Sequence, residues 1–194
     1  VNTLGTALLL ELLTDRDRFP VRKLIVPSSM SIYGEGLYQV GGNEVTPHLR
    51  AKEQLESKSW EILSNGEVCQ PVATPETKSL RPTSIYAITK RDQEEMALSI
   101  GEASGIPTIA LRYFNIYGPR QSLSNPYTGV AAIFSSRLLN GNPPVVFENG
   151  GQLRDFVHVS DIVQANILAT INDSIDQGVY NIGRCLNYHK KVIL

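Results

Sequence analysis

Amphipathic helical segments alternate with short apolar segments along this chain, and this alternation restricts its fold more than any other feature. Apolar residues recur at helical spacing through residues 2–13 and again through 84–103. Each segment is followed by a compact run typical of a buried strand, at 23–29 and 108–114. A repeated helix–strand order predicts an α/β fold in which helices cover both faces of a parallel sheet.

Further elements are predicted beyond residue 129. Their order is a helix over about 130–139 closed by Gly141, a short strand over 145–147, a half-exposed strand over 153–159, a helix to about 171 and a last strand over 179–183. Because these elements are more mixed than those before them, we expect a smaller lobe packed against the main sheet.

The stretch 34–81 differs from both of these regions. It contains scattered glycine and proline around a charged middle, and no strand of useful length is expected in it. Residues 49–63 predict one poorly periodic surface helix that turns Trp60, Ile62 and Leu63 towards the body of the protein. Connections of this length inside a compact domain are usually lids or binding elements. We therefore expect a long excursion that covers a site.

Composition and charge exclude several classes of protein. Hydrophobic residues make up 42% of the 194 residues and charged residues 19%, which is typical of a globular chain. Because the net charge is −1 and no basic stripe with interleaved aromatic residues occurs, we expect no nucleic-acid partner. The longest apolar run, at residues 7–13, is too short to span a bilayer, so we interpret it as a core helix and expect no membrane partner.

Cysteine and histidine give no metal-binding pattern. Cys69 and Cys185 lie far apart and neither belongs to a C-x-x-C pair, which favours neither a zinc site nor a disulfide framework. Unpaired cysteines fit a reducing compartment, so we expect a cytoplasmic location. His158 alternates to the same face as Phe156 without a metal-ligand companion, and we interpret it as structural.

A tyrosine and a lysine on the second predicted helix form the first candidate site. Tyr86 and Lys90 are four residues apart within 84–103, so they face the same way and can meet one ligand together. From this spacing alone, a packing tyrosine and a solvated lysine are the more ordinary interpretation. A catalytic interpretation therefore depends on other residues.

Three serines at the end of the first predicted strand form the second candidate site. Ser28, Ser29 and Ser31 follow the apolar part of the run 23–29. In parallel α/β sheets ligands bind outside the carboxyl ends of the strands, which is where these hydroxyls would lie. Taken alone, the segment favours an ordinary turn whose serines bond their own backbone.

Six separated motifs are informative together where each alone is weak. In chain order they are Asn2–Thr6, Ser28–Glu35, Tyr86-x-x-x-Lys90, Leu111–Arg120, Arg154–Asp161 and Tyr180–Gly183. Their number and order resemble the extended short-chain dehydrogenase/reductases, in particular the NAD-dependent nucleotide-sugar epimerases and dehydratases. The resemblance covers nearly the whole chain. It implies a Rossmann-like doubly wound parallel sheet with a smaller C-terminal substrate lobe, NAD as the cofactor and a nucleotide sugar as the substrate.

The resemblance implies three catalytic residues. Tyr86 matches the acid/base that removes a proton from a sugar hydroxyl. A free tyrosine has a pKa of about 10, and the positive charge of Lys90 would favour the phenolate while its ammonium binds the nicotinamide ribose. Ser29 matches the family's catalytic serine or threonine, which hydrogen-bonds the reacting oxygen.

The resemblance also implies two groups of binding residues. Residues expected to contact the cofactor are Asn2, Ser28, Tyr86, Lys90 and Tyr113. Residues expected to contact the substrate are Ser31, Asn115 at a phosphate, Phe147 beside the nucleotide base and Arg154 at the diphosphate.

Two departures from the family pattern refine this picture. Members that eliminate water carry carboxylates at the strand tip, whereas this chain has Ser29-Met30-Ser31, which favours a 4-epimerase acting through a 4-keto intermediate. The glycine-rich phosphate-binding turn and its strand are not in the sequence, which starts at the following helix. We therefore expect an N-terminally truncated cofactor domain over 1–128 and an incomplete substrate lobe over 129–194.

The connection from Tyr33 to Tyr86 is longer than in most family members, because it contains the excursion 34–81. Among members with such a connection, the sequence most resembles the dTDP-L-rhamnose 4-epimerases. An NADPH-dependent 4-keto-sugar reductase with the same residues is the enzymatic alternative. A third possibility is an inactive partner of the intact enzyme, because the family forms homodimers through helices matching 2–13 and 84–103.

Overall fold

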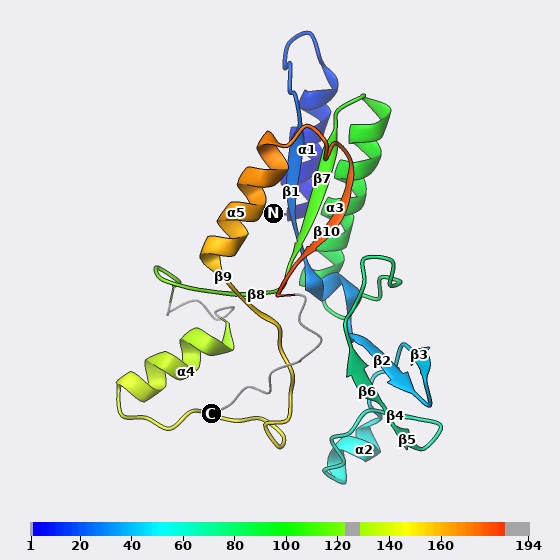
Figure 1. Cartoon of the computed structure of the whole chain (residues 1–194), viewed down its shortest axis with the longest axis vertical. Coiled ribbons are helices and arrows are strands. Elements are labelled where there is room, and N and C mark those ends of the chain that lie inside the picture. The colour runs from blue at the N-terminus through cyan, green and yellow to red at the C-terminus, as the bar shows by residue number, and fades with distance from the viewer. Residues whose placement is uncertain (1, 123–128, 185–194) are drawn as a thin grey trace. The chain divides into compact units, whose positions relative to one another are not determined.

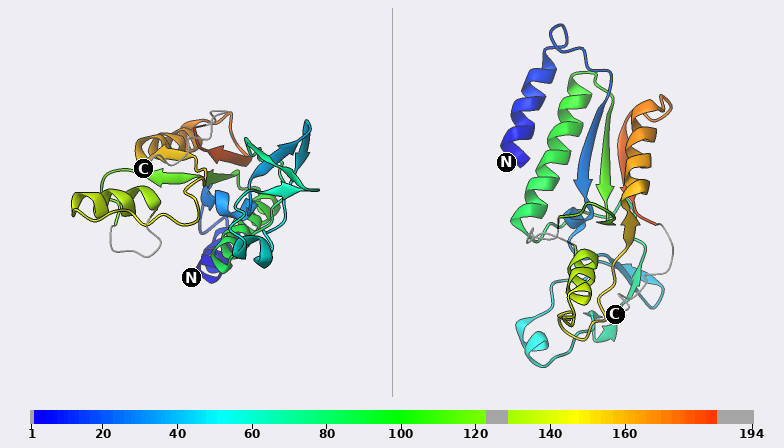
Figure 2. Two further views of the ribbon diagram at one scale, coloured as in Figure 1. Left: turned by 90° about the horizontal axis from the view of Figure 1, so that it is seen from below. Right: turned by 90° about the vertical axis from the view of Figure 1, so that its left-hand side faces the viewer.

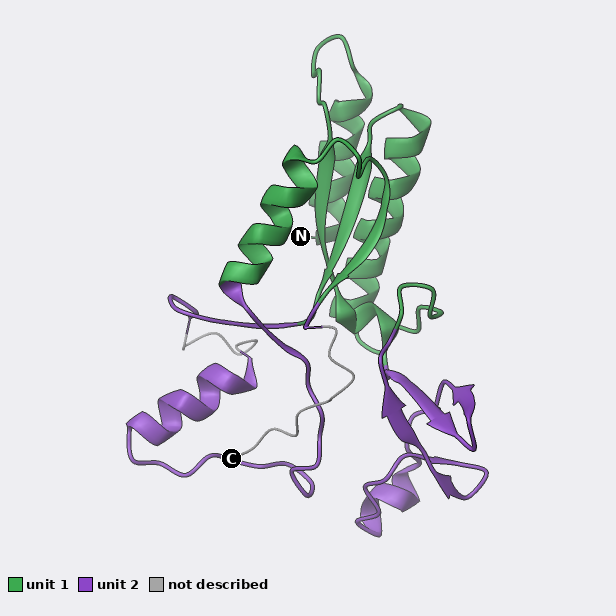
Figure 3. Ribbon diagram, in the orientation of Figure 1, with its two compact units in different colours: residues 1–34, 75–114, 160–182 green, residues 35–74, 115–159, 183–194 purple. Residues whose placement is uncertain are grey.

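The computed structural model describes residues 2–122 and 129–184 (Figure 1). The chain forms two compact units, each assembled from segments that are distant in sequence (Figure 3). Unit 1 comprises residues 1–34, 75–114 and 160–182, and unit 2 comprises 35–74, 115–159 and 183–194. The division of the chain at residue 128 stays a prediction.

Unit 1 is built on a three-stranded parallel sheet with β7 in the centre. Its strands lie in the order β1 (Leu24–Ser29), β7 (Thr108–Tyr113) and β10 (Gly178–Ile182). The first five residues of β7 are buried, as expected for a central strand covered on both faces. The register places Ser29 opposite Tyr113 at the carboxyl ends of β1 and β7.

Helices cover both faces of this sheet, which confirms the predicted fold class. On one face Leu10 of α1 (Asn2–Thr14) and Ala97 of α3 (Ile85–Ala103) pack with Val26. On the other, Ala169 of α5 (Val159–Ile171) packs with Ile109 and Leu111. Figure 2 shows α1 (blue) and α3 (green) on one side of the strands and α5 (orange) on the other.

The apolar stripe of α1 faces outwards, contrary to the expectation that this segment is a core helix. Its buried residues are Leu10 and Leu13. The other leucines leave half or more of their surface accessible: Leu4 68%, Leu8 54%, Leu9 51% and Leu12 52%. The helix carries apolar residues around most of its circumference, so periodicity alone did not separate the buried face from the exposed one.

Both ends of α3 follow from local sequence signals. The Ser84 Oγ accepts a hydrogen bond from the Ala87 amide at 3.1 Å and so satisfies a donor that the first helical turn leaves unpaired. After the helix, Gly105 adopts φ +64°, a left-handed conformation that glycine tolerates best and that ends helices. The helix predicted over 84–103 is confirmed.

A charged cluster is buried where α3 meets β7. The Arg112 guanidinium binds the Glu94 carboxylate through Nε and Nη2, and the two side chains are only 5% and 2% exposed. Arg112 Nη1 also donates to the Tyr33 hydroxyl at 2.7 Å, and that hydroxyl donates to Asn181 Oδ1 at 2.8 Å. Burial raises the pKa of Tyr33, although its contact with Arg112 acts in the opposite direction. The cluster thus links α3, β7, β10 and the 3₁₀ helix η1 (Met30–Tyr33).

Unit 2 contains an antiparallel sheet in the stretch where no useful strand was expected. The sheet has the order β3-β2-β6, and a second hairpin pairs β4 with β5. Gly41 and Gly42 join β2 to β3, and Asn65 and Gly66 join β4 to β5, all with positive φ as two-residue hairpin turns require. The bounds are β2 Leu37–Val40, β3 Asn43–Val45, β4 Leu63–Ser64, β5 Glu67–Val68 and β6 Gln70–Val72. The helix expected over 49–63 is reduced to α2 (Lys52–Glu56).

In the rest of unit 2, the predicted helix agrees with the structure and the predicted strands agree less well. The predicted helix 130–139 is confirmed as α4 (Val130–Leu139). The strand predicted over 145–147 was wrong, because these residues form no strand. The strand predicted over 153–159 is reduced to β9 (Phe156–His158), which pairs in parallel with β8 (Asn115–Tyr117). His158 lies edge-on to the Tyr117 ring at 5.3 Å between centroids.

Three further properties concern the described residues alone. No helix among them is long and apolar enough to cross a bilayer. They contain no group of three or more histidine, cysteine or acidic side chains arranged to hold a metal ion. Cys69 is a buried free thiol, and Cys185 lies outside the described part of the chain. The cytoplasmic location stays a prediction.

Arg112→Ala is expected to destabilise the protein by about 3–5 kcal/mol, because it leaves the Glu94 carboxylate buried without its partner. Combining Glu94→Leu with Arg112→Met should restore most of that loss, since no buried charge then remains. Urea unfolding followed by far-ultraviolet circular dichroism measures both. Arg22→Ala, which removes an ion pair whose side chains are 91% and 83% exposed, should leave the midpoint unchanged. Equal midpoints for Arg112→Ala and the wild type would contradict this role.

Candidate functional site

The end of β1 places two serine hydroxyls in contact. Ser31 Oγ lies 2.9 Å from Ser29 Oγ, and the Ser31 amide donates to Ser29 Oγ at 3.2 Å. This second bond is the cap of η1, for which Ser29 is the N-cap residue. The structure therefore contains the turn that the serine pattern favours when taken alone. The same turn leaves both hydroxyls at the carboxyl end of a parallel strand.

Lys90 is anchored to the same strand end. Its ammonium donates to the Pro27 carbonyl oxygen at 2.7 Å and to Gln93 Oε1 at 2.9 Å. Burial lowers the pKa of the half-buried Lys90. An ammonium has three N–H donors, and the described residues engage two of them. One donor therefore remains for a bound ligand.

Tyr86 and Asn2 are connected to Lys90 through α3, Tyr86 by its position on the helix and Asn2 by a contact with Thr89. Tyr86 is in the first turn of α3, one turn before Lys90, and 49% of its surface is accessible. Asn2 Nδ2 donates weakly to Thr89 Oγ1 at 3.4 Å, which brings the start of α1 to the residue beside Lys90. A half-exposed phenol on a helix face has access to a ligand.

Ser28 and Tyr113 complete the residues expected in this unit. Ser28 is 3% exposed, and its Oγ has no hydrogen-bond partner among the described residues. The Tyr113 hydroxyl donates to Asn166 Oδ1 at 2.8 Å, and burial raises its pKa. Hydrogen bonds and sheet register therefore gather the seven residues that unit 1 contributes: Asn2, Ser28, Ser29, Ser31, Tyr86, Lys90 and Tyr113.

The three other expected residues belong to unit 2. Asn115 Nδ2 donates to the Asp155 carbonyl at 3.1 Å. Arg154 contacts only neighbours among the described residues, donating to the Leu153 carbonyl at 2.7 Å and to Gln152 Oε1 at 3.4 Å. Phe147 is 75% exposed. Phe147 and Arg154 line a common cavity of about 560 Å³, whose wall is otherwise mostly apolar.

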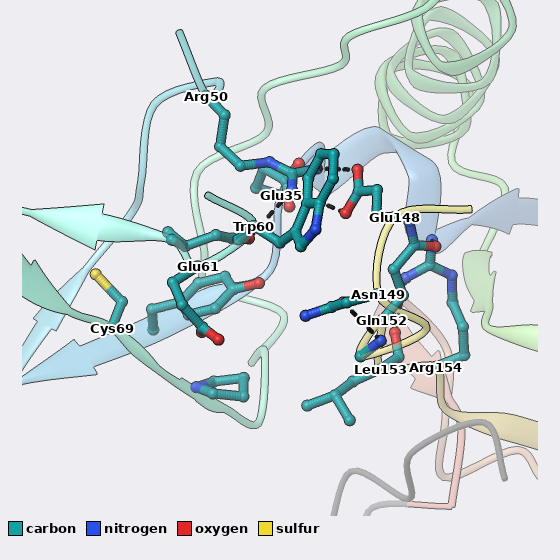
Figure 4. A pocket seen from close by; sticks show the side chains of 14 residues that line it. Glu35, Arg50, Trp60, Glu61, Cys69, Glu148, Asn149, Gln152, Leu153 and Arg154 are labelled. Atoms are coloured by element: carbon teal, nitrogen blue, oxygen red, sulfur yellow. Dashed lines mark hydrogen bonds and ion pairs between the residues drawn. The ribbon is translucent and has the colours of Figure 1, made fainter. Parts of the chain in front are cut away.

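A second cavity of unit 2, of about 250 Å³, lies between the excursion and the loop 148–154. Residues from the excursion include Trp60, Glu61 and Tyr38, and Arg154 and Gln152 contribute from the loop (Figure 4). Arg154 and Gln152 line both cavities.

An ion pair fastens the excursion to this loop. Arg50 Nη1 and Nη2 donate to the two carboxylate oxygens of Glu148 at 2.9 and 2.8 Å, and Nη1 also donates to the Trp60 carbonyl at 3.1 Å. The side chains of the pair are only 23% and 20% exposed. The hydrogen bonds from Arg50 hold the pKa of Glu148 below its usual range. A bidentate ion pair of this kind fixes the relative orientation of the two side chains in addition to joining them.

Sequence reasoning missed Gln93, Arg112 and Arg50. Gln93 binds Lys90 and also donates to Thr6 Oγ1 at 2.8 Å, so it joins α3 to α1. Its position three residues after Lys90 on one helix face was the available signal. Arg112 inside an apolar strand pattern was a second signal, because a charge there requires a partner. No sequence signal pairs Arg50 with Glu148.

Comparison with known proteins identifies the family. The sequence model of the NAD dependent epimerase/dehydratase family matches residues 1–183. The chain belongs to this family. The resemblance carried by the six motifs is thus confirmed, as is the Rossmann-like class of the fold.

Two relatives are about one-third identical to the chain over the aligned residues. The dTDP-L-rhamnose 4-epimerase of Burkholderia thailandensis is 33% identical over 94% of this chain and 50% of its own length. The crystal structure of UDP-glucose 4-epimerase from Thermotoga maritima with UDP-glucose is 32% identical, with a TM-score of 0.67 over 94% of this chain and 47% of that one.

A third relative was solved with both a nucleotide sugar and NAD. This UDP-glucuronic acid 4-epimerase from Bacillus cereus is 26% identical, with a TM-score of 0.68 over 94% of this chain and 45% of that one. The chain thus spans about half the length of these relatives.

Glu148→Gln is expected to destabilise unit 2 by about 1 kcal/mol at neutral pH. The native pKa of Glu148 is depressed, so the pair contributes fully above the unfolded pKa of about 4.3. That contribution is lost as the pH falls through the lower native value. Urea unfolding followed by tryptophan fluorescence should therefore separate variant from wild type at pH 7 and bring them together at acidic pH. Glu44→Gln serves as the control, and a difference that does not depend on pH would contradict the assignment.

Proposed function

We propose that the chain is the part of an NAD-dependent nucleotide-sugar 4-epimerase that carries its acid/base residues, with dTDP-L-rhamnose as the proposed substrate. The observation that carries this proposal is the contact between Lys90 and the Pro27 carbonyl, which joins the helix of Tyr86 to the strand end of Ser29. Family membership and the 4-epimerase relatives support the reaction class.

The residues of unit 1 fit a nicotinamide cofactor. The buried Ser28 hydroxyl has an unused hydrogen-bonding capacity, and Lys90, which binds the carbonyl of the preceding Pro27, has one unused N–H donor. Both suit the hydroxyls and amide of a nicotinamide riboside, with Asn2 and Tyr113 as further contacts. Bound NAD would supply the redox chemistry, which is the uptake and return of a hydride at C4 of the sugar.

The side chains of unit 1 would carry one proton from the substrate hydroxyl and back to it. Tyr86 accepts the proton of the C4 hydroxyl and returns it after the sugar has turned. Lys90 stabilises the phenolate that this transfer requires, and Ser29 donates a hydrogen bond to the C4 oxygen. In unit 2, Arg154 binds the diphosphate, Phe147 contacts the base in the apolar cavity, and Asn115 contacts a phosphate. Ser31 holds Ser29 and contacts the sugar.

The strand end favours epimerisation over elimination. Elimination of water needs an additional acid and base, and Ser29-Met30-Ser31 supplies hydroxyls in place of carboxylates. The reductase alternative uses the same residues but consumes one reduced cofactor per turnover.

Tyr86→Phe is expected to lower the turnover of the intact enzyme by about 10²–10⁴-fold, because the phenol is the proposed proton carrier. Conversion of dTDP-L-rhamnose to its C4 epimer measures this loss, and hydrogen label at C4 should be retained in the product. Tyr180→Phe, in β10, is the matched control. Full activity of Tyr86→Phe would contradict the role, and stoichiometric loss of NADPH would favour the reductase.

The outward leucine stripe supports a homodimer through α1 and α3. The stripe of Leu4, Leu8, Leu9 and Leu12 is joined by Ile85 and Ile88 of α3, which are 82% and 42% exposed. Exposed apolar side chains gathered on neighbouring helices are typical of association sites. Pairing these two helices with their copies would remove the stripe from water.

Leu8→Glu is expected to convert a dimer into a monomer at micromolar concentration, because it places two charges in the proposed interface. Sedimentation velocity measures the change. Leu139→Glu, on α4, alters a residue that is 87% exposed and outside the stripe, so it should leave the dimer intact. A wild-type monomer, or a dimer that survives Leu8→Glu, would contradict the interface.

A further inference from the structure

The cavity between the excursion and the loop 148–154 has walls suited to a hydroxylated ring. Trp60 and Tyr38 provide aromatic surface, and Glu35 and Glu61 provide carboxylates (Figure 4). Carboxylates accept hydrogen bonds from hydroxyl groups, and aromatic faces pack against the C–H face of a sugar. Trp60, Tyr38 and Glu61 belong to the excursion and to none of the six family motifs, whereas Glu35 is the last residue of the second motif.

Charge argues against a phosphate deep in this cavity. Glu148 neutralises the charge of Arg50. Within the described ranges 2–122 and 129–184, Glu35 and Glu61 form no ion pair. Burial raises the pKa of Tyr38, and the charge of Glu35 acts in the same direction, whereas the charges of Arg154 and Arg50 act against it. Two carboxylates repel an anion, whereas they suit a neutral ring with hydroxyl donors.

The two cavities of unit 2 share Arg154 and Gln152. A diphosphate held by Arg154 would therefore have the apolar Phe147 cavity on one side and the carboxylate-lined cavity on the other. The volume of about 250 Å³ is below the roughly 300–1,000 Å³ of cavities for drug-sized ligands, so it admits one ring.

We propose that the excursion binds the hydroxylated ring attached to the diphosphate of the nucleotide sugar, with Trp60 and Glu61 as the contacting residues. This inference rests on the proposed function. The ring is either the ribose or the sugar, and both present the same chemistry. Arg50 is a positioning residue here, because it bonds the Trp60 carbonyl and Glu148 at the same time and so holds the excursion beside Arg154.

Trp60 is the only tryptophan in the sequence, so tryptophan fluorescence reports on this cavity without any substitution. Titration of the unmodified protein with UDP-glucose or a dTDP-sugar should change that fluorescence with the same midpoint as calorimetric binding. Inorganic diphosphate should leave it unchanged. A change with UDP as well as UDP-glucose supports the ribose as the ring, and a change with UDP-glucose alone supports the sugar.

Two results would overturn the inference. One is calorimetric binding of a nucleotide sugar with no change in Trp60 fluorescence, and the other is the full change with inorganic diphosphate alone. The first leaves the proposed function intact. If the folded wild type binds no nucleotide sugar at all, the proposed function fails and the inference fails with it.

A matched pair of variants tests the carboxylate. Glu61→Ala should raise the Kd for the nucleotide sugar about tenfold, because a hydroxyl of the ligand loses the carboxylate that accepts its hydrogen bond. Glu67→Ala, in β5 of the same excursion but outside the cavity, should leave the Kd unchanged. Arg154→Ala should weaken the binding of UDP and the binding of the nucleotide sugar alike. Equal Kd values for Glu61→Ala and the wild type, beside weakened Arg154→Ala, would overturn the ring site and not the proposed function.

Discussion

The buried pair of Arg112 and Glu94 sets the position of α3 on the sheet. A charge removed from water has to meet its partner with good geometry, so this pair permits little sliding of the helix along β7. Lys90 lies one turn before Glu94 on the same helix, and its bond to the Pro27 carbonyl therefore falls at one place on β1. The Arg112–Glu94 pair therefore helps to hold the acid/base residues of α3 at the strand end that carries the serines.

Most of unit 1 could be predicted from sequence, because its helices and strands are long enough to show their periods. The helix predicted over 84–103 agrees with α3, whose ends are set by the Ser84 cap and by Gly105. The orientation of α1 could not be predicted, since leucines surround the helix and only packing decides which of them are buried. The hairpins within 35–74 were missed because strands of two to four residues show no alternation. Their turn pairs, Gly41-Gly42 and Asn65-Gly66, carried the only usable signal.

The candidate site divides in the same way. Family motifs located Ser29, Tyr86 and Lys90, and short-range contacts then explain how they meet. Arg50 and Glu148 are far apart in sequence, and neither belongs to a motif, so only the folded chain reveals their contact. The excursion was expected to cover a site, and the structure adds which loop of unit 2 it contacts.

Chemistry and recognition are carried by different segments if the excursion is a wall of the substrate site. Tyr86 and Lys90 are fixed by the sheet and the buried pair, whereas Trp60 and Glu61 lie in the segment between α2 and β4, where Arg50 bonds the Trp60 carbonyl. The loop 148–154 connects the two cavities of unit 2, because Arg154 lines both. Changes within the excursion would alter the ring that is accepted while the diphosphate contact and the proton carrier stay in place. The three relatives named above are 4-epimerases of different nucleotide sugars, and a separation of this kind accommodates such variation.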